Sequence, residues 1–424
     1  MPERIIINFD DEKEKPGRAE SQIDDSRIVI DFGEDGKKVK VENLEKSYEE
    51  KILNLKINSF FKGNSHLNNS FDTELSFPEG IEQGFRKKFS INLKEEFFNS
   101  VLENNRYIIL SSKNGNIYLI DRFSGAIKEK MFFENESFEK TGLVFENSIY
   151  INSLKKIFLL NDSAGGKIKS EAIYSLDNEY FIWSNLNRYK NFLMFTEFST
   201  LSKKAFLKII DINNTEIKYE HSFDVYGFVC DKICIAEDCA YVLYDSSVLV
   251  YDMTRKTGEV HPLKFKTDEN SFIFYLNYRI YITSNLNELY YLDLPSLNYG
   301  FRFSGIKNNY VNSIGGFADN IFIGTLDGWK FYKISGLSVY NYEDEYENKI
   351  EAISKNILIV SQKNKIVFCN LNRFQEAEGY VLASKENGEK VEIISAIFSI
   401  NEIFVLTQKG LFEVFTNDKL NIHI

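Results

Sequence analysis

The side chains that most often carry chemistry are few and scattered in this chain. None of its four histidines has a second metal ligand at the spacing of a metal site, and its four cysteines miss the Cys-x-x-Cys spacing of zinc and redox sites. Three of the cysteines lie in or beside apolar segments, where a thiol packs as a small hydrophobic group. We therefore expect structural histidines, free thiols in a reducing compartment, and neither a metal nor a cofactor. The four histidines are His66, His221, His261 and His423, and the four cysteines are Cys230, Cys234, Cys239 and Cys369.

Catalytic motifs do not stand out either. The sequence contains no Gly-x-Ser-x-Gly elbow, no Walker loop and no Gly-x-Gly-x-x-Gly after a strand. A glycosidase would require two carboxylates about 5 to 9 Å apart on one face, and no such pair is marked among the 62 acidic residues. Residues 324–328 are expected to form a hairpin turn. The acidic run at 343–347 is expected to be a solvated loop, with an electrostatic patch for a basic partner as the alternative.

Composition limits the kind of partner. The chain has 424 residues, of which 43% are hydrophobic, and a net charge of −11. A surplus of acidic residues argues against binding to the phosphate backbone of nucleic acids. No segment approaches the roughly 20 apolar residues of a membrane-spanning helix, and the N-terminus lacks the apolar run of a secretory signal. We expect a cytoplasmic protein with no nucleic-acid partner and no membrane insertion; abundant Phe, Asn, Lys and Ile suggest a bacterial source.

One unit recurs along most of the chain: a short apolar strand, a polar turn, and a second apolar strand that usually ends in Asp or Asn. Its clearest copies are at 106–121 and 279–293. The eight copies end at intervals of 36 to 50 residues with a mean of 42, and a four-stranded propeller blade takes about 40 to 45 residues. A βαβ fold would need helical patterns between the strands, and a β-sandwich would not keep this period. The copies end at Asp121, Asn161, Asp211, Asp252, Asp293, Ile334, Asn370 and Phe415.

Two of these copies resemble a known repeat. Tyr118-Leu-Ile-Asp121-Arg-Phe-Ser-Gly125 is similar to the strand-Asp-x-x-Thr/Ser-Gly pattern of quinoprotein-like (PQQ-like) propellers, and residues 249–258 form a looser copy. The resemblance covers about residues 86 to 420. It extends to WD40-like propellers, and in both cases it concerns the fold alone. It implies no cofactor, because the chain has two tryptophans and lacks the Trp-rich blade docking of quinoprotein dehydrogenases. Gly125 and Gly258 are expected to supply the positive φ that these turns need.

These patterns predict an all-β fold, a closed β-propeller of eight four-stranded blades over residues 86–424. Seven blades is the alternative, if the wide copy at 176–222 merges with a neighbour. Closure needs a strand that joins the first and last blades, and residues 86–93 and 419–424 are both candidates. Five turns follow the same strand of their blades, so we expect them to share one rim that binds partners. They are at 113–116, 245–247, 284–287, 327–328 and 363–365.

The N-terminal 40 residues differ in kind: they form an acidic flexible tail that holds two near-copies of one short motif, 23 residues apart. Each copy is a β-prone core with a basic residue before it and acidic residues after it. One interpretation is strand addition, in which each copy docks on an exposed sheet edge of a partner protein. The other is a hairpin of the two copies against the outside of the propeller. The candidate partner-binding residues are Arg4, Ile5, Ile6, Ile7, Phe9, Arg27, Ile28, Val29, Ile30 and Phe32.

Residues 41–85 connect this tail to the repeats. An apolar face at three-and-four spacing predicts an amphipathic helix over 41–61, packed on the propeller or offered to a partner. Asn, Ser, Gly and Pro predict a loop over 62–85.

Three functions remain open at this point. The first is a non-enzymatic interaction scaffold, a subunit of a multi-protein assembly that recruits partners through its N-terminal motifs and its blade-rim loops. The alternative is a propeller enzyme acting on a small molecule or glycan at the channel mouth. The third is an envelope-assembly propeller of the lipoprotein kind, which the missing signal peptide and lipid-attachment cysteine argue against.

Overall fold

The computed structural model describes residues 5–7, 28–30 and 85–417, apart from 147, 163–167, 177–178, 304–310, 335–337, 344–346, 354–356, 363–364, 372–374, 382–391 and 400–401. The chain divides into two compact units, Met1–Leu55 and Lys56–Ile424. The first contains β1 (Ile5–Ile7) and β2 (Ile28–Ile30), which pair antiparallel. The predicted helix at 41–61 and nearly all of the predicted loop at 62–85 lie outside the described residues.

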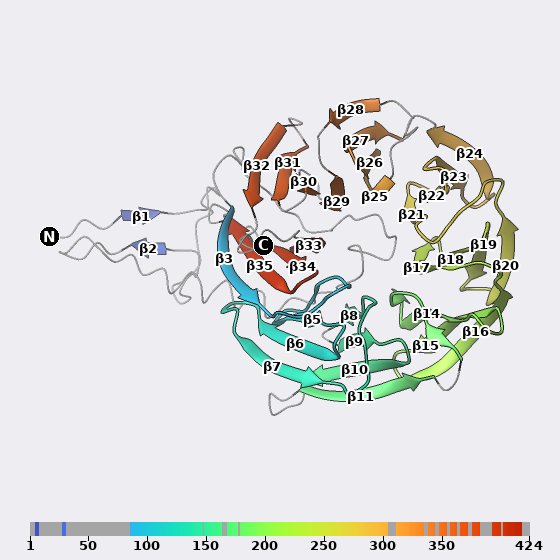
Figure 1. The fold of residues 1–424 in the computed structure, drawn as a ribbon, viewed down its shortest axis with the longest axis horizontal. Helices are drawn as coiled ribbons and strands as arrows, with labels where there is room; N and C mark the ends of the chain where they lie inside the picture. The colour runs from blue at the N-terminus through green and yellow to red at the C-terminus, as the bar shows by residue number, and fades with distance from the viewer. Residues whose placement is uncertain are drawn as a thin grey trace, which may run out of the picture. The chain divides into compact units, whose positions relative to one another are not determined.

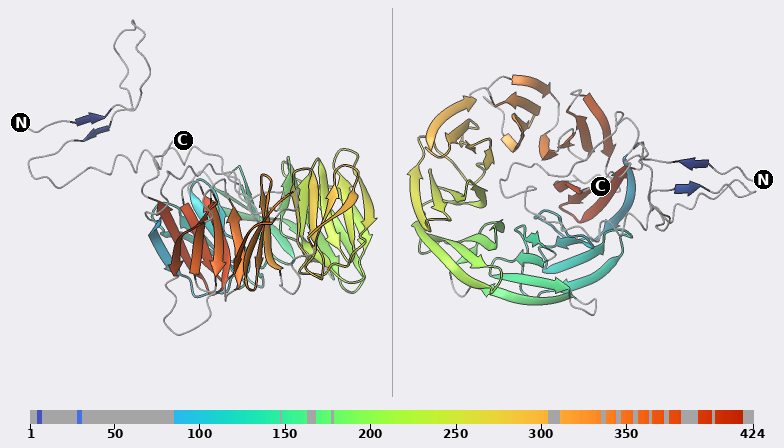
Figure 2. Two further views of the ribbon diagram at one scale, coloured as in Figure 1. Left: turned by 90° about the horizontal axis from the view of Figure 1, so that it is seen from above. Right: turned by 180° about the vertical axis from the view of Figure 1, so that it is seen from behind.

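The second unit is a ring of eight β-sheets around a central axis (Figure 1). Seven of the sheets are built from strands consecutive in the chain, and neighbouring strands pair antiparallel. The edge-on view in Figure 2 shows the strands running between the two faces of the disc. The eight-bladed prediction is confirmed, and the wide copy at 176–222 forms a blade of its own.

Blades 1 to 4 contain the following strands, from the inner to the outer edge. Blade 1 has β4 (Leu102–Glu103), β5 (Tyr107–Ser111), β6 (Asn116–Asp121) and β7 (Ile127–Phe132). Blade 2 has β8 (Leu143–Phe145), β9 (Ser148–Asn152), β10 (Lys156–Asp162) and β11 (Ile168–Ser175). Blade 3 has β12 (Phe181–Ile182), β13 (Asn187–Tyr189), β14 (Phe192–Ser199), β15 (Lys204–Asp211) and β16 (Glu216–Asp224). Blade 4 has β17 (Val229–Ala236), β18 (Cys239–Tyr244), β19 (Ser247–Asp252) and β20 (Thr257–Pro262).

The remaining blades follow the same plan. Blade 5 has β21 (Ile273–Leu276), β22 (Arg279–Thr283), β23 (Leu289–Asp293) and β24 (Asn298–Phe303). Blade 6 has β25 (Val311–Phe317), β26 (Asn320–Thr325), β27 (Gly328–Lys333) and β28 (Ser338–Glu343). Blade 7 has β29 (Asn348–Ile353), β30 (Ile357–Gln362), β31 (Lys365–Asn370) and β32 (Gln375–Val381). Blade 8 has β33 (Ile393–Ser399), β34 (Glu402–Thr407), β35 (Leu411–Asn417) and β3 (Phe85–Asn92).

The ring is closed by the strand that precedes the first blade. β3 pairs antiparallel with β35, from Phe85 opposite Asn417 to Asn92 opposite Leu411. In Figure 1 the blue β3 lies beside the red β35. The last blade therefore takes its fourth strand from the segment before blade 1, which decides between the two predicted closures.

The apolar runs of the repeat are the second and third strands of each blade. In β5 all five residues are buried, and β6 is buried up to its last residue, because blades pack against both faces of these strands. The outer β7 carries no fully buried residue, and its Lys and Glu side chains protect the exposed edge.

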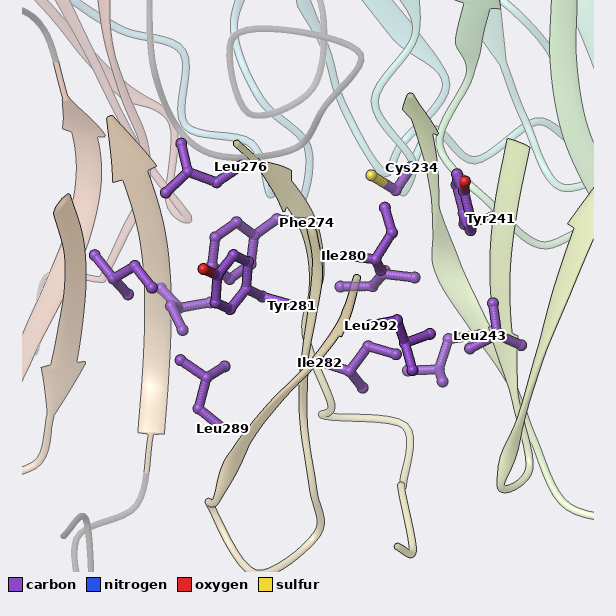
Figure 3. Close-up of a cluster of buried hydrophobic side chains, with 14 of the residues drawn as sticks. Cys234, Tyr241, Leu243, Phe274, Leu276, Ile280, Tyr281, Ile282, Leu289 and Leu292 are labelled. Carbon is purple, nitrogen blue, oxygen red and sulfur yellow. The ribbon is translucent and has the colours of Figure 1, made fainter. Parts of the chain in front are cut away.

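Each interface between blades holds part of the core. Between blades 4 and 5, Cys234 and Tyr241 lie across from Ile280 and Leu292 (Figure 3). On the other face of blade 5, toward blade 6, Phe274 and Tyr281 stack with ring centroids 5.1 Å apart. Cys230, Cys234 and Cys369 are buried free thiols, as predicted, and Cys239 is half-buried.

The Asp residues at the strand ends organise turns, as predicted. Asp121 Oδ1 accepts hydrogen bonds from the backbone of Phe123 and Ser124 at 3.2 and 2.8 Å, and Gly125 follows with a φ of 71°.

The expectation for Gly258 is wrong. In the longer turn after Asp252, Lys256 takes the left-handed conformation with a φ of 61°, and Gly258 lies inside β20. A Cβ atom at 258 would stand 2.7 Å from Nε2 of His221, so close packing by blade 3 explains this glycine.

Hydrogen bonds join every blade to the next around the ring. Most of them start or end at side chains near the beginning of the inner strands, so the centre of the disc is rigidly connected. In order from blade 1, the pairs are Ser100–Thr141, Leu186–Thr141, Asn185–Asp231, Cys230–Ser271, Val311–Asn287, Ile350–Ser313, Lys349–Ile393 and Val101–Ser395.

Candidate functional site

Two kinds of connection share one end of the propeller. One links the second strand of a blade to the third, and the other links an outer strand to the inner strand of the next blade. Backbone hydrogen bonds join them directly: Lys113 N donates to Glu96 O at 2.9 Å, and Asp245 N donates to Phe228 O at 3.0 Å. We call this end the loop face. The five predicted rim turns all link second to third strands and so belong to it, although residues 363–364 of the last turn lie outside the described residues.

Exposed large hydrophobic side chains gather at the loop face. Of the eleven found among the described residues, seven lie in its connections or at strand ends next to it. Leu201, Tyr226 and Leu286 are 79, 78 and 72% exposed. At the opposite end, Tyr278 lies in a hairpin and Ile127 begins β7, and the other two, Ile217 and Val260, are on outer strands. The seven are Phe98, Phe132, Phe181, Leu201, Tyr226, Leu286 and Leu326.

The centre of the loop face is hollowed by two adjoining cavities. The smaller one, of about 250 Å³, is lined by residues from all eight blades and marks the mouth of the central channel. The larger one, of about 410 Å³, lies over blades 2 to 6. They share Asp231, Lys232, Phe272 and Asn312. The larger cavity is also lined by Lys140, Trp183, Val229, Glu269, Asn270 and Val311.

An interrupted inner strand brings blade 3 into this mouth. β12 and β13 both pair with β14, and residues 183–186 leave the ladder between them. Trp183 Nε1 donates to Val229 O at 2.6 Å, which fixes the indole against blade 4. Asn185 accepts from Thr141 N at 2.7 Å and donates to Asp231 O at 3.0 Å, so it bridges blades 2 and 4.

The main charged group of the mouth is a carboxylate between two lysines. Lys140 Nζ lies 3.1 Å from Asp231 Oδ2, and Lys232 Nζ lies 2.8 Å from Asp231 Oδ1. Burial opposes ionisation of Asp231, but the two ammonium groups outweigh it and hold the pKa of this carboxyl well below its usual range. Burial also disfavours the charged form of Lys232, but the attraction of Asp231 outweighs the effect of burial and raises the pKa of Lys232. Asp231 and Lys232 therefore remain charged at neutral pH.

Other mouth residues are paired in the same way. Lys349 Nζ lies 3.3 Å from Glu351 Oε1, and Ser361 Oγ donates to that carboxylate at 2.7 Å. Lysines also lie over the aromatic walls: the ammonium of Lys140 is 5.3 Å from the Trp183 ring centroid, and that of Lys232 is 5.5 Å from the Phe272 ring centroid. The mouth is an aromatic hollow in which Asp231 and Glu351 are paired with lysines, and Glu139 and Glu269 complete its charged lining.

The predicted tail motifs are placed only in part. The two cores pair with each other, with Ile5 opposite Ile30, Ile6 opposite Val29 and Ile7 opposite Ile28. This pairing agrees with one element of the hairpin interpretation. Arg4, Phe9, Arg27 and Phe32 lie outside the described residues, and partner binding by the motif stays a prediction.

Among the described residues, no group of three or more His, Cys, Asp or Glu side chains is arranged to hold a metal ion. His261 lies 3.8 Å from Glu259, and His221 packs at Gly258, so neither lies in the mouth. In that same part of the chain, no helix has the length and apolarity to cross a membrane.

Sequence reasoning missed the channel mouth. Its residues come from eight separate blades, and each is unremarkable in its own segment. One signal was available: the interval of 50 residues that ends at Asp211 is the widest of the series, and it contains the interrupted strand with Trp183 and Asn185.

A closed ring of eight sheets with a hollowed loop face defines this part of the chain as an eight-bladed β-propeller. Among solved structures it is similar to the crystal structure of BamB from Moraxella catarrhalis, with a TM-score of 0.54 and 11% sequence identity over 79% of this chain and 100% of that chain. This likeness confirms the predicted quinoprotein-like resemblance at the level of the fold, and at this identity it shows the fold alone. No protein-family model matches the sequence, and a search of curated proteins also finds no match.

Proposed function

We propose that this protein is a non-enzymatic interaction scaffold of the cytoplasm, a subunit of a multi-protein assembly whose loop face binds a partner protein. The observation that carries the proposal is the concentration of exposed hydrophobic side chains at this face. Such side chains in contact with water are typical of surfaces that become buried on association, with aromatic residues as anchors.

The rigidity of the ring supports this role. Hydrogen bonds join all eight blades near the axis, so the connections of the loop face are held in fixed positions relative to one another. A preorganised surface loses little conformational entropy when it binds.

The tail motifs supply a second contact in this proposal. β1 and β2 form a two-stranded sheet, and each strand of such a sheet has an outer edge to which a further strand can add. An extended segment of a partner would pair with one of these edges through its backbone, as in strand addition.

The mouth geometry does not favour the enzyme alternative. A general acid or base works best with a pKa near the operating pH. Asp231 is held ionised by two lysines, and Glu351 is engaged by Lys349 and Ser361, so both carboxylates serve as ion-pair partners.

The test compares hydrophobic residues at the two ends of the disc. The partner is first captured from the native host and purified. Tyr226→Ser and Leu286→Ser on the loop face should each lower the affinity for it by about tenfold or more, because a few anchor residues carry most of the energy of an interface. Tyr278→Ser is the matched control, since Tyr278 is 67% exposed at the opposite end. Equal binding by all three variants would contradict the proposal, and loss only after removal of residues 1–40 would assign binding to the tail.

A further inference from the structure

We propose that the larger cavity at the channel mouth binds one carboxylate of an acidic side chain of the docked partner, held between Lys140 and Lys232. The inference rests on the proposed function, because the carboxylate is taken to belong to the protein that covers the loop face. It adds the chemistry by which the centre of that face recognises its partner.

Lys140, Asp231 and Lys232 form a charged triad that leaves room for one anion. Asp231 gives one oxygen to each lysine, at 3.1 and 2.8 Å, so two ammonium groups share a single carboxylate and the triad carries one net positive charge. An ammonium group has three donors, and within the described part of the chain the only ion pairs of Lys140 and Lys232 are those with Asp231. A second carboxylate that bridges both lysines would neutralise the triad.

Burial makes this charge effective. The side chains of Lys140 and Lys232 are 20 and 12% exposed. The rings of Trp183 and Phe272 form the adjacent walls. Charges with little exposure are screened less by water and salt than surface charges, so a bound carboxylate gains more here than at an open lysine. Hydrogen bonds between ionised groups are also about twice as strong as neutral ones.

The cavity favours an acidic side chain over phosphate and polyanions. Its volume of about 410 Å³ lies in the usual range of about 300 to 1,000 Å³ for ligand pockets. Trp183, Phe272 and Val311 offer apolar contact to the methylene groups of an acidic side chain. The triad carries one net positive charge, so it balances a single carboxylate but not the higher charge of phosphate or a polyanion. Glu269 lines the same cavity but is exposed, so water and salt screen its charge more than those of the triad.

The tryptophans provide a direct readout. The chain has two, and Trp329 is buried in β27 at 2% exposure, so Trp183 alone reports on the cavity. The probes are the peptides acetyl-Leu-Glu-Leu-amide and acetyl-Leu-Gln-Leu-amide, which differ only in the carboxylate. We expect the Glu peptide to change the fluorescence saturably and the Gln peptide to have no such effect. Equal responses to both peptides would overturn the inference.

Variants of the triad sharpen the test. Lys140→Met leaves Asp231 and Lys232 as a neutral pair, so affinity for the Glu peptide should fall by about tenfold or more, the loss expected for one hydrogen bond to a charged group. Asp231→Asn and Glu269→Gln remove negative charge and should strengthen binding. Lys264→Met is the control, because Lys264 lies on the loop face outside both cavities. If Lys140→Met fails to fold, Asp231→Asn provides the test. Weaker binding of the Glu peptide by Asp231→Asn would contradict the inference.

The partner experiment separates this inference from the function on which it rests. If partner binding falls in Tyr226→Ser and Leu286→Ser and also in Lys140→Met and Lys232→Met, both stand. If only the hydrophobic variants weaken it, the scaffold function holds and the carboxylate inference is overturned. If none of the four weakens it, the loop-face function fails, and the peptide titration alone decides whether the cavity binds a carboxylate.

Discussion

At the scale of single residues, Arg122 is a charged side chain that is fully buried between the first and last blades. Its guanidinium lies 2.6 Å from Glu103 of blade 1 and 3.3 Å from Glu402 of blade 8, and it also bonds to Ser399. Lys88 of β3 reaches Glu402 at 2.7 Å. Burial raises the pKa of Glu103, and Arg122 opposes that rise. One arginine thus connects the two blades that the chain must join to close the ring.

The first stability prediction concerns this residue. Arg122→Met should lower the free energy of unfolding by about 3–5 kcal/mol, because it leaves the buried Glu103 without its arginine partner and leaves Glu402 with Lys88 alone. Arg255→Met is the matched control, since the Arg255 side chain is 81% exposed, and it should change stability by less than about 0.5 kcal/mol. Chemical denaturation followed by circular dichroism measures both. Similar values for the two variants would show that the buried cluster does not stabilise closure.

At the scale of elements, the third strand of each blade could be predicted closely. The expected ends at 121, 211, 252, 293 and 370 agree with β6, β15, β19, β23 and β31, and the others differ by one or two residues. The reason is physical: a strand buried on both faces must be apolar, and an Asp or Asn at its end supplies the acceptor for the turn.

Other elements could not be predicted because their partners are distant in the chain. The strand-like alternation at 86–93 makes it a candidate for closing the ring, but nothing local decides between it and 419–424, because its partner β35 lies more than 300 residues away. The interruption between β12 and β13 depends on contacts of Trp183 and Asn185 with blades 2 and 4. The channel mouth could not be predicted for the same reason. In the sequence, the neighbours Asp231 and Lys232 look like an ordinary surface pair.

The element-scale prediction concerns closure by β3. A chain that starts at Leu93 lacks this strand and exposes the edge of β35 together with Phe412 and Val414, which are fully buried in the closed ring. We expect it to aggregate or to melt well below a chain that starts at Phe85, because an open apolar edge pairs with other chains. Thermal melts and light scattering compare the two chains. Equal melting temperatures, with both chains monomeric, would show that β3 is dispensable for closure.

At the scale of the whole molecule, the two ends of the disc differ. Among the residues described, the loop face collects seven of the eleven exposed large hydrophobic side chains, whereas the opposite end has Tyr278 and Ile127. The loop face also surrounds the channel mouth with its lysine–aspartate triad. This asymmetry has no role in holding the blades together, which the core and the inter-blade hydrogen bonds accomplish. In the scaffold proposal, it follows that partners bind at the loop face.

Hydrogen–deuterium exchange of the protein with and without its captured partner tests this claim most directly. We predict slower exchange in the loop-face connections, above all at 224–232, 263–272 and 284–288, and unchanged exchange in the hairpins at 237–238 and 277–278 of the opposite end. Protection confined to the opposite hairpins or to the outer strands would contradict the account.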